Sequence, residues 1–269
     1  MVVLKLAKMF LLPKGTGLIR YIPYLFIIPV LVFHALALTG CVSTSPGIPN
    51  IYVVSLRSAE LANTNNTDLD VQVRIGYFGM CGISEEHGTL CGTVSGRSVE
   101  DLSSTLFPAA TASNNTLLKN EITDLITTAQ DLQTEIFISI LAGAAVLFIA
   151  GLVALFFFKQ DRKKNATEWY EQGKWSKIVK RGTYGALFLS AAMTFASALA
   201  TSQSAGALQI TSAVMENASV LIKTGTTIQV FQWIAFGFGF SFAAVVPFLA
   251  KPREESGSGE YVDKEGNVV

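Results

Sequence analysis

The chain has 269 residues, of which 50% are hydrophobic and only 15% are charged. A soluble domain usually has about a quarter charged residues, and here the charges are missing from long stretches and gather between them. The formal net charge is zero, so no global basic field favours nucleic acid as a partner. These totals favour an integral membrane protein over a soluble or nucleic-acid-binding one.

Four apolar stretches are each long enough, at roughly 20 residues, to cross a hydrocarbon core about 30 Å thick. The first is longer than the apolar region of a signal peptide, which is about 7–15 residues. Beyond Arg20 the four stretches contain no Asp, Glu, Lys or Arg, and we interpret His34 in the first as a packed side chain. The sequence therefore predicts an all-α membrane protein, a bundle of four transmembrane helices.

The Lys and Arg residues give the orientation, because cytoplasmic loops carry an excess of them. Of the 20 such residues, 15 lie before the first span, between the second and third, or after the fourth. Both termini are therefore expected in the cytoplasm of a multi-pass protein. The expected segments are a cytoplasmic amino-terminal segment 1–18, spans 19–41, 136–158, 182–201 and 226–250, extracellular loops 42–135 and 202–225, a cytoplasmic loop 159–181 and a disordered cytoplasmic tail 251–269.

Three Asn-x-Ser/Thr triplets fall on the predicted outside, where they can be glycosylated. They begin at Asn65, Asn114 and Asn217. A fourth triplet, at Asn165, falls on the predicted inside and should stay unmodified. The placement of the first three agrees with the topology that the positive charges predict.

The first loop is the one segment between spans that is large enough for a folded extramembrane unit. Apolar residues alternate with polar ones in short runs at 51–56, 71–78 and 89–94, which predicts β-strands. From about 115 to 135 the pattern turns helical, and we expect that helix to continue into the second span. The loop also has eleven acidic against four basic residues, a balance that raises the local concentration of cations. The sequence thus predicts a small acidic β-sheet unit outside the membrane.

Such a small sheet buries little apolar surface and needs a covalent staple. Cys81 and Cys91 can supply it as a disulfide in the oxidising exterior. A metal site is the rival interpretation, because Glu85, Glu86 and His87 lie between the two cysteines, but their spacing matches no common closed zinc site.

Cys41 follows the first apolar run and is expected at the outer membrane boundary, either free or lipidated. The preceding Leu-Thr-Gly also fits a bacterial lipoprotein processing site. Cleavage there would leave three spans and move the carboxyl terminus to the opposite side, which the charge asymmetry argues against.

The segment 76–81 reads Gly-Tyr-Phe-Gly-Met-Cys and resembles the claudin-superfamily signature Gly-Leu-Trp-x-x-Cys, with its second Cys a few residues later. The whole layout is similar to the fungal family of pheromone-induced calcium regulators and mating membrane-fusion proteins. In that family a Gly-Cys pair ends the first span, as Gly40 and Cys41 do here, and a Tyr-Phe-Gly-x-Cys motif follows. The motif residues are Gly76, Tyr77, Phe78, Gly79 and Cys81.

The resemblance implies a claudin-like fold, with an extracellular β-sheet above the four-helix bundle. It also implies a plasma-membrane protein that promotes low-affinity calcium influx and cell fusion during fungal mating. A pore-forming calcium channel subunit and a structural organiser of plasma-membrane domains, as in eisosome-associated proteins, are the alternatives.

The chain has no nucleophile elbow, no zinc-protease motif, no P-loop and only two histidines, so we expect no enzyme, cofactor, metal or small-molecule substrate. The expected partners are the lipid bilayer together with a calcium channel or further copies of the chain. Because ionisable residues inside spans usually mark ion pathways, their scarcity favours a regulator over a single-subunit pore.

Overall fold

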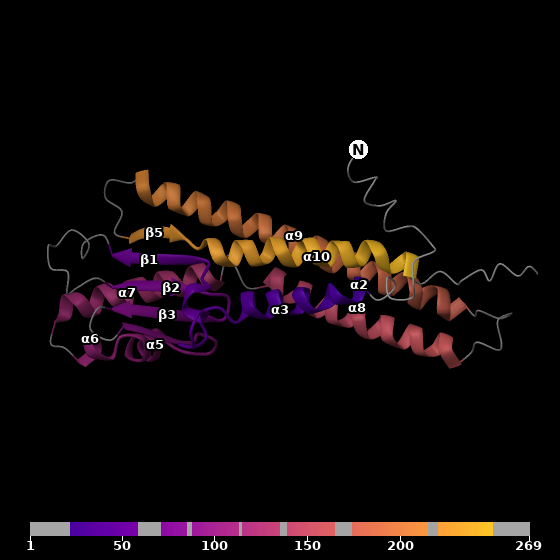
Figure 1. Ribbon diagram of the computed structural model, residues 1–269. Helices are drawn as coiled ribbons and strands as arrows, with labels where there is room; N and C mark the ends of the chain where they lie inside the picture. The colour runs from indigo at the N-terminus through magenta and orange to yellow at the C-terminus, as the bar shows by residue number, and fades with distance from the viewer. Residues whose placement is uncertain are drawn as a thin grey trace, which may run out of the picture.

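The computed structural model describes residues 22–58, 71–84, 88–112, 115–134, 139–164, 174–214 and 220–249. These residues form a bundle of long helices with a sheet and shorter helices at one end (Figure 1). The amino-terminal segment, the tail and the three predicted glycosylation residues Asn65, Asn114 and Asn217 lie outside the described residues, as do Glu85, Glu86 and His87.

The bundle places α9 in the centre, packed against α8 and α10, with α10 also packed against α3. Phe242 and Ala243 of α10 and Leu187 of α9 are part of its buried core. The helices of the bundle are α2 (Ile22–Leu25), α3 (Ile27–Leu38), α8 (Ser139–Lys164), α9 (Lys174–Val214) and α10 (Thr226–Leu249).

Three helices of the described part are long and apolar enough to cross a membrane, within Ile140–Phe157, Ile178–Ser212 and Thr226–Pro247. Pro23–Leu38 is apolar but shorter than the roughly 20 residues that a span needs. The predicted start of that first span lies outside the described residues. The structure therefore supports the second, third and fourth predicted spans, and the first, at 19–41, stays a prediction.

A five-stranded antiparallel sheet confirms the predicted sheet and extends it, and its extracellular location stays a prediction. Its order is β4-β3-β2-β1-β5. The predicted runs contribute β1, β2 and β4, whereas β3 and β5 were not predicted. The strands are β1 (Val54–Ser58), β2 (Gln72–Ile75), β3 (Gly79–Ser84), β4 (Gly88–Thr93) and β5 (Val220–Thr224).

Helices α5 and α7 pack against the sheet and bury most of its apolar side chains. The predicted helix at 115–135 is α7 (Thr116–Leu132), which begins where the Asn115 side chain accepts a hydrogen bond from the Leu118 amide. Its expected continuation into α8 falls on residues 135–138, outside the described part. The remaining short helices are α5 (Val99–Leu106), α6 (Pro108–Ala112) and the 3₁₀ helix η2 (Ile48–Asn50).

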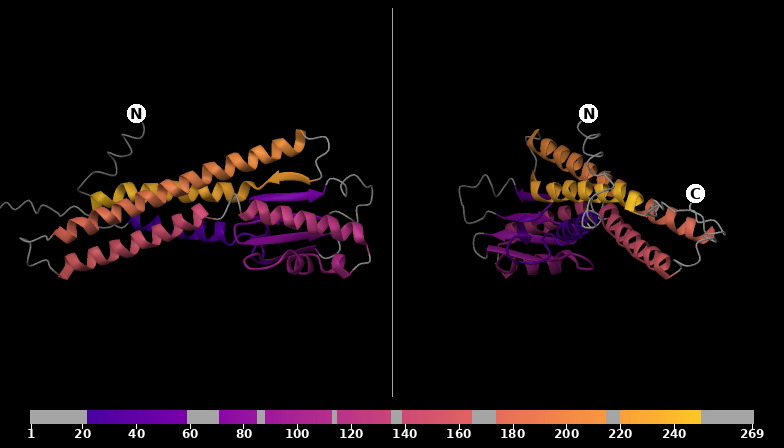
Figure 2. Two further views of the ribbon diagram at one scale, coloured as in Figure 1. Left: turned by 180° about the vertical axis from the view of Figure 1, so that it is seen from behind. Right: turned by 45° about the vertical axis from the view of Figure 1, so that its right-hand side comes forward.

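The stretch 202–225, expected to be a loop, is largely regular structure. Helix α9 runs on to Val214, and β5 then pairs antiparallel with β1. The Ser212 hydroxyl accepts a hydrogen bond from the Ile222 amide, so α9 lies along the outer edge of β5. In Figure 2 the far end of α9 reaches out beside the sheet. The two segments that were predicted to be extracellular thus build one layer.

Candidate functional site

The family-motif residues form the turn between β2 and β3, at the end of the sheet that faces the bundle (Figure 1). Strand β2 ends at Ile75 and β3 begins at Gly79, and the Gly76 amide donates to the Gly79 carbonyl at 2.8 Å. The turn therefore presents Tyr77 and Phe78 where the layer that contains the sheet meets the helices.

Glycine is required on both sides of this turn, because the chain that leaves α3 passes directly against it. A Cβ on Gly76 would lie 2.2 Å from the Gly40 carbonyl oxygen, and one on Gly79 would lie 2.2 Å from the Cys41 carbonyl oxygen. Both distances are far below van der Waals contact. The Gly-Cys pair and the aromatic motif, which lie far apart in the sequence, therefore form one structural unit.

Tyr77 joins this turn to the bundle. Its ring is completely buried, and its hydroxyl accepts a hydrogen bond from Gln232 Nε2 of α10 at 2.5 Å. The same hydroxyl lies 3.2 Å from Thr201 Oγ1 and 3.5 Å from Ser197 Oγ, both on α9. One motif side chain thus holds two long helices to the layer that contains the sheet.

Gln133, just after α7, fixes the backbone of the same turn. Its Nε2 donates to the carbonyl oxygens of Gly76 at 3.0 Å and Tyr77 at 2.8 Å. Since carbonyls only accept hydrogen bonds, this pairing also fixes which end of the amide faces the turn. The Gln133 oxygen must therefore point the other way.

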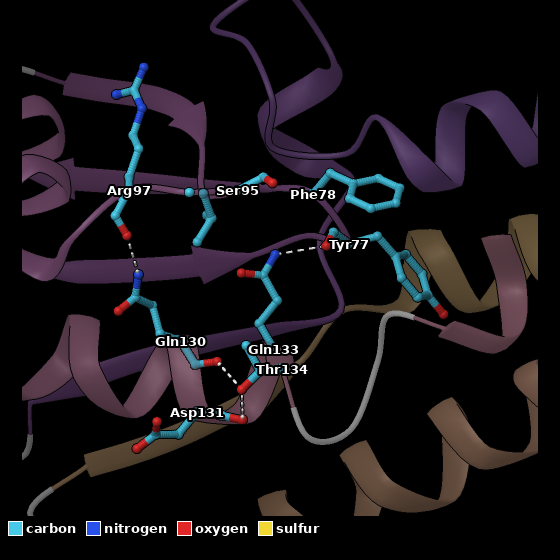
Figure 3. Close-up of a pocket in the computed structure, with 10 residues that line it drawn as sticks. Tyr77, Phe78, Ser95, Arg97, Gln130, Asp131, Gln133 and Thr134 are labelled. Atoms are coloured by element: carbon cyan, nitrogen blue, oxygen red, sulfur yellow. Dashed lines mark hydrogen bonds between the residues drawn. The ribbon is translucent and has the colours of Figure 1, made fainter.

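Phe78 is one of the residues that line a half-open hollow of about 480 Å³ (Figure 3). Its ring is 37% exposed, although its neighbour Tyr77 is fully buried. We refer to this space as the Phe78 hollow. Its lining residues are Tyr77, Phe78, Val94, Ser95, Gly96, Arg97, Gln130, Asp131, Gln133 and Thr134.

The predicted disulfide is confirmed. Cys81 and Cys91 lie directly opposite each other in the β3–β4 pair and are bonded. Both sulfurs are therefore occupied, which overturns the rival metal site built on these cysteines. Among the described residues, no group of three or more His, Cys, Asp or Glu side chains could hold a metal ion.

Cys41 is a free thiol, and its burial argues against the lipidated alternative. It lies beyond the end of α3, with its Sγ 3.6 Å from the Ile51 carbonyl oxygen and no exposed surface. Burial raises the pKa of the thiol to about 12, against the opposing attraction of Arg74.

His34 is buried, as the sequence interpretation expected. Its Nδ1 lies 2.9 Å from the Val30 carbonyl oxygen and its Nε2 lies 3.3 Å from Thr194 Oγ1. Gln133 and Gln232 were not predicted from the sequence. A glutamine within an apolar span is a recognised signal of interhelical hydrogen bonding, and it could have identified Gln232, whereas no pattern marks Gln133.

No curated protein matches the chain. A family model described as "Ca2+ regulator and membrane fusion protein Fig1" matches residues 58–250, more than two thirds of the chain. The match includes the motif turn, the disulfide and the helices that hold Tyr77. The chain therefore belongs to the family of Fig1 calcium regulators and membrane fusion proteins.

Proposed function

We propose that this protein acts in the fungal plasma membrane, where it regulates low-affinity calcium influx and promotes cell fusion during mating. It is not an enzyme, and it acts through its extracellular layer, with both termini in the cytoplasm. The observation that carries the proposal is the hydrogen-bonded anchor from Tyr77 to Gln232 and Thr201, within a chain of the calcium-regulator family.

The anchor gives the extracellular layer a direct mechanical connection to the helices. The hydroxyl of Tyr77 bonds side chains of both α9 and α10, and α9 in turn lies along β5 at the edge of the sheet. A partner that moves the sheet therefore also moves these two helices. This is the arrangement expected of a regulator that passes an extracellular contact to a calcium channel in the same membrane.

The polar groups inside the bundle favour regulation over conduction by a single copy. Ser190 donates to the Ala144 carbonyl at 2.7 Å, and Thr194 lies between Ser190 and His34. These neutral groups satisfy one another and hold helices together, and the four apolar stretches contain no acidic side chain. A calcium filter commonly uses rings of carboxylates or carbonyls.

The deciding experiment measures calcium entry into liposomes that contain only the purified protein, beside calcium influx in fungal cells lacking it. We expect no flux in liposomes and reduced influx in the cells. Liposome flux that disappears when acidic residues of the first loop are neutralised would instead establish a channel subunit. Normal influx and normal mating fusion in the deficient cells would contradict both functions and favour an organiser of membrane domains.

The braced extracellular layer is tested separately by Cys81→Ala/Cys91→Ala, with Cys41→Ala as the matched control. We expect the double variant to lose calcium-entry activity and the control to retain it, because only the first pair braces the sheet. Surface abundance must be equal in the comparison. Full activity of the double variant at normal abundance contradicts a working role for this layer.

A further inference from the structure

Arg74 carries a positive charge that no described residue neutralises. Its side chain is half-buried and lies on the face of β2 opposite the fully buried Val73 and Ile75. Its guanidinium contacts two neutral oxygens and one aromatic ring, and no carboxylate of the described part of the chain. Because a charge removed from water needs a partner of opposite charge, an anion would be stabilised here.

The hydrogen bonds of Arg74 use only one side of the guanidinium. Nη1 donates to the Pro49 carbonyl oxygen at 3.1 Å and to Asn50 Oδ1 at 2.9 Å, which occupies both of its hydrogens. Nε is buried and has no hydrogen-bond partner among the described residues. Nε and Nη2 together present two parallel N–H groups, the edge with which arginine binds two oxygens of one carboxylate or phosphate. The unused edge therefore has the geometry of an oxyanion site.

Tyr52 holds the guanidinium from a third direction. The central carbon of the guanidinium lies 4.9 Å from the centroid of the Tyr52 ring, which is a cation–π contact. With Nη1 bonded and one face on the ring, the group is fixed before any ligand arrives, and this lowers the entropic cost of binding. The bond to Asn50 is exposed, so the guanidinium reaches the surface of the layer.

The position of this pair identifies the anion. The Tyr52 carbonyl leaves no room for a Cβ on Gly225, and the candidate span of α10 begins at the next residue, where β5 runs into α10 (Figure 1). Arg74 lies two residues before Gly76 of the motif turn, about 7 Å along a strand that rises about 3.3 Å per residue. The head-group region of each leaflet is about 5–8 Å thick. The guanidinium therefore lies at the level of the lipid phosphates.

We propose that Arg74, held by Tyr52, binds the phosphate of a phospholipid in the leaflet next to the sheet. At this depth a bilayer supplies a phosphate on every phospholipid, and the fork of arginine matches two phosphate oxygens. The contact fixes the sheet to the membrane surface and does not select a head group. It is independent of whether the protein conducts or regulates calcium.

The test uses the purified full chain in a maltoside detergent, which contains no phosphate. Native mass spectrometry measures dissociation constants for phosphatidylcholine and for a diacylglycerol with identical acyl chains. We expect phosphatidylcholine to bind at least about tenfold more tightly, because only this lipid can accept from Nε and Nη2. Equal affinities overturn the proposal. Inorganic phosphate should displace the lipid only at a large excess, and displacement at equal concentrations overturns the assignment to a lipid.

Two variants locate the contact. Arg74→Gln should weaken phosphatidylcholine binding by about tenfold and leave diacylglycerol unchanged. Arg74→Lys retains the charge without the two-nitrogen edge and should weaken binding by at least about threefold. Arg57→Gln is the matched control and should have no effect, because Arg57 is an exposed arginine opposite Gln72, on the same face and farther from the bundle.

Thermal unfolding of the three variants shows whether each is folded. A preference for phosphatidylcholine that survives Arg74→Gln contradicts this location of the site. Should Arg74→Gln fail to fold, Arg74→Lys decides, because binding as tight as that of the parent would overturn the two-nitrogen contact.

Discussion

The two sides of the motif turn differ sharply although only one peptide bond separates their central residues. On the Tyr77 side the turn is closed, because the ring has no exposed surface and its hydroxyl bonds side chains of α9 and α10. On the Phe78 side it is open, with a half-exposed ring beside a hollow of about 480 Å³. We refer to the closed side as the junction. The comparison teaches that one short motif can combine a structural anchor with a surface left free for binding.

The junction should be the point at which substitutions destabilise the sheet and its helices most. Gly79→Ala places a methyl group 2.2 Å from the Cys41 carbonyl oxygen, and backbone on both sides prevents relaxation. We expect a loss of about 3 kcal/mol or more in the free energy of unfolding, measured by circular dichroism during thermal unfolding in detergent.

Gly92→Ala is the matched control for this substitution. Gly92 lies on the adjacent strand, and an added Cβ would meet Thr105 at an ordinary 3.7 Å. We expect a change well under about 1 kcal/mol. Equal losses of stability for Gly79→Ala and Gly92→Ala would show that the close backbone approach does not make the junction more sensitive to an added methyl group.

The disulfide is expected to have the next largest effect. Cys81→Ala/Cys91→Ala opens a loop whose ends are 10 residues apart in sequence, which costs about 2–3 kcal/mol in the chain-entropy model. Thermal unfolding of the double variant and of the oxidised parent measures this cost, and the reduced parent serves as a second comparison. A double variant as stable as the oxidised parent would mean that the helices alone brace the hairpin.

Tyr77→Phe removes only the hydroxyl of the anchor and tests the comparison most directly. Gln232 and Thr201 then lose a buried partner, so we expect the free energy of unfolding to fall by about 1–2 kcal/mol. Adding Gln232→Leu should recover part of it, because the unpaired amide is removed as well. Phe78→Leu, on the open side, should cost less than about 1 kcal/mol. Equal costs for Tyr77→Phe and Phe78→Leu would contradict the distinction between the two sides.

The local pattern of the sequence was sufficient to predict much of the extracellular layer. Strict alternation predicted the strand that contains Val73 and Ile75, and helical periodicity predicted α7. The cysteine spacing predicted the disulfide, since Cys81 and Cys91 come directly opposite in one hairpin. Each of these features depends on residues close to one another in the chain.

The features that were missed depend on distant partners. Strand β5 pairs with β1 across most of the chain, and β3 contains Gly79 and Gly82, which weaken any strand pattern. Gln133 is one polar residue among several near the end of α7, and its role exists only because the turn at Tyr77 is folded against it. The open and closed sides of the motif could not be told apart, because two adjacent aromatic residues give the same signal in sequence.

The smallest expected effect at the junction depends on pH and comes from Cys41. Its thiol is neutral in the fold, because burial raises its pKa from the usual 9.0 to about 12. The unfolded chain releases this proton above pH 9, whereas the folded chain retains it. The thiol therefore contributes its full stability below pH 9, and the free energy of unfolding falls as the pH rises from 9 toward 12.

Cys41→Ala removes this dependence without removing the other groups that titrate in the same range. We expect the stability difference between the parent and Cys41→Ala to be constant from pH 7 to 8. At pH 10 the parent should have lost about 1 kcal/mol of stability relative to Cys41→Ala. Unfolding in detergent at matched pH values measures it. A difference that does not change with pH would mean that water reaches the thiol, and the junction would then be as open as the Phe78 side.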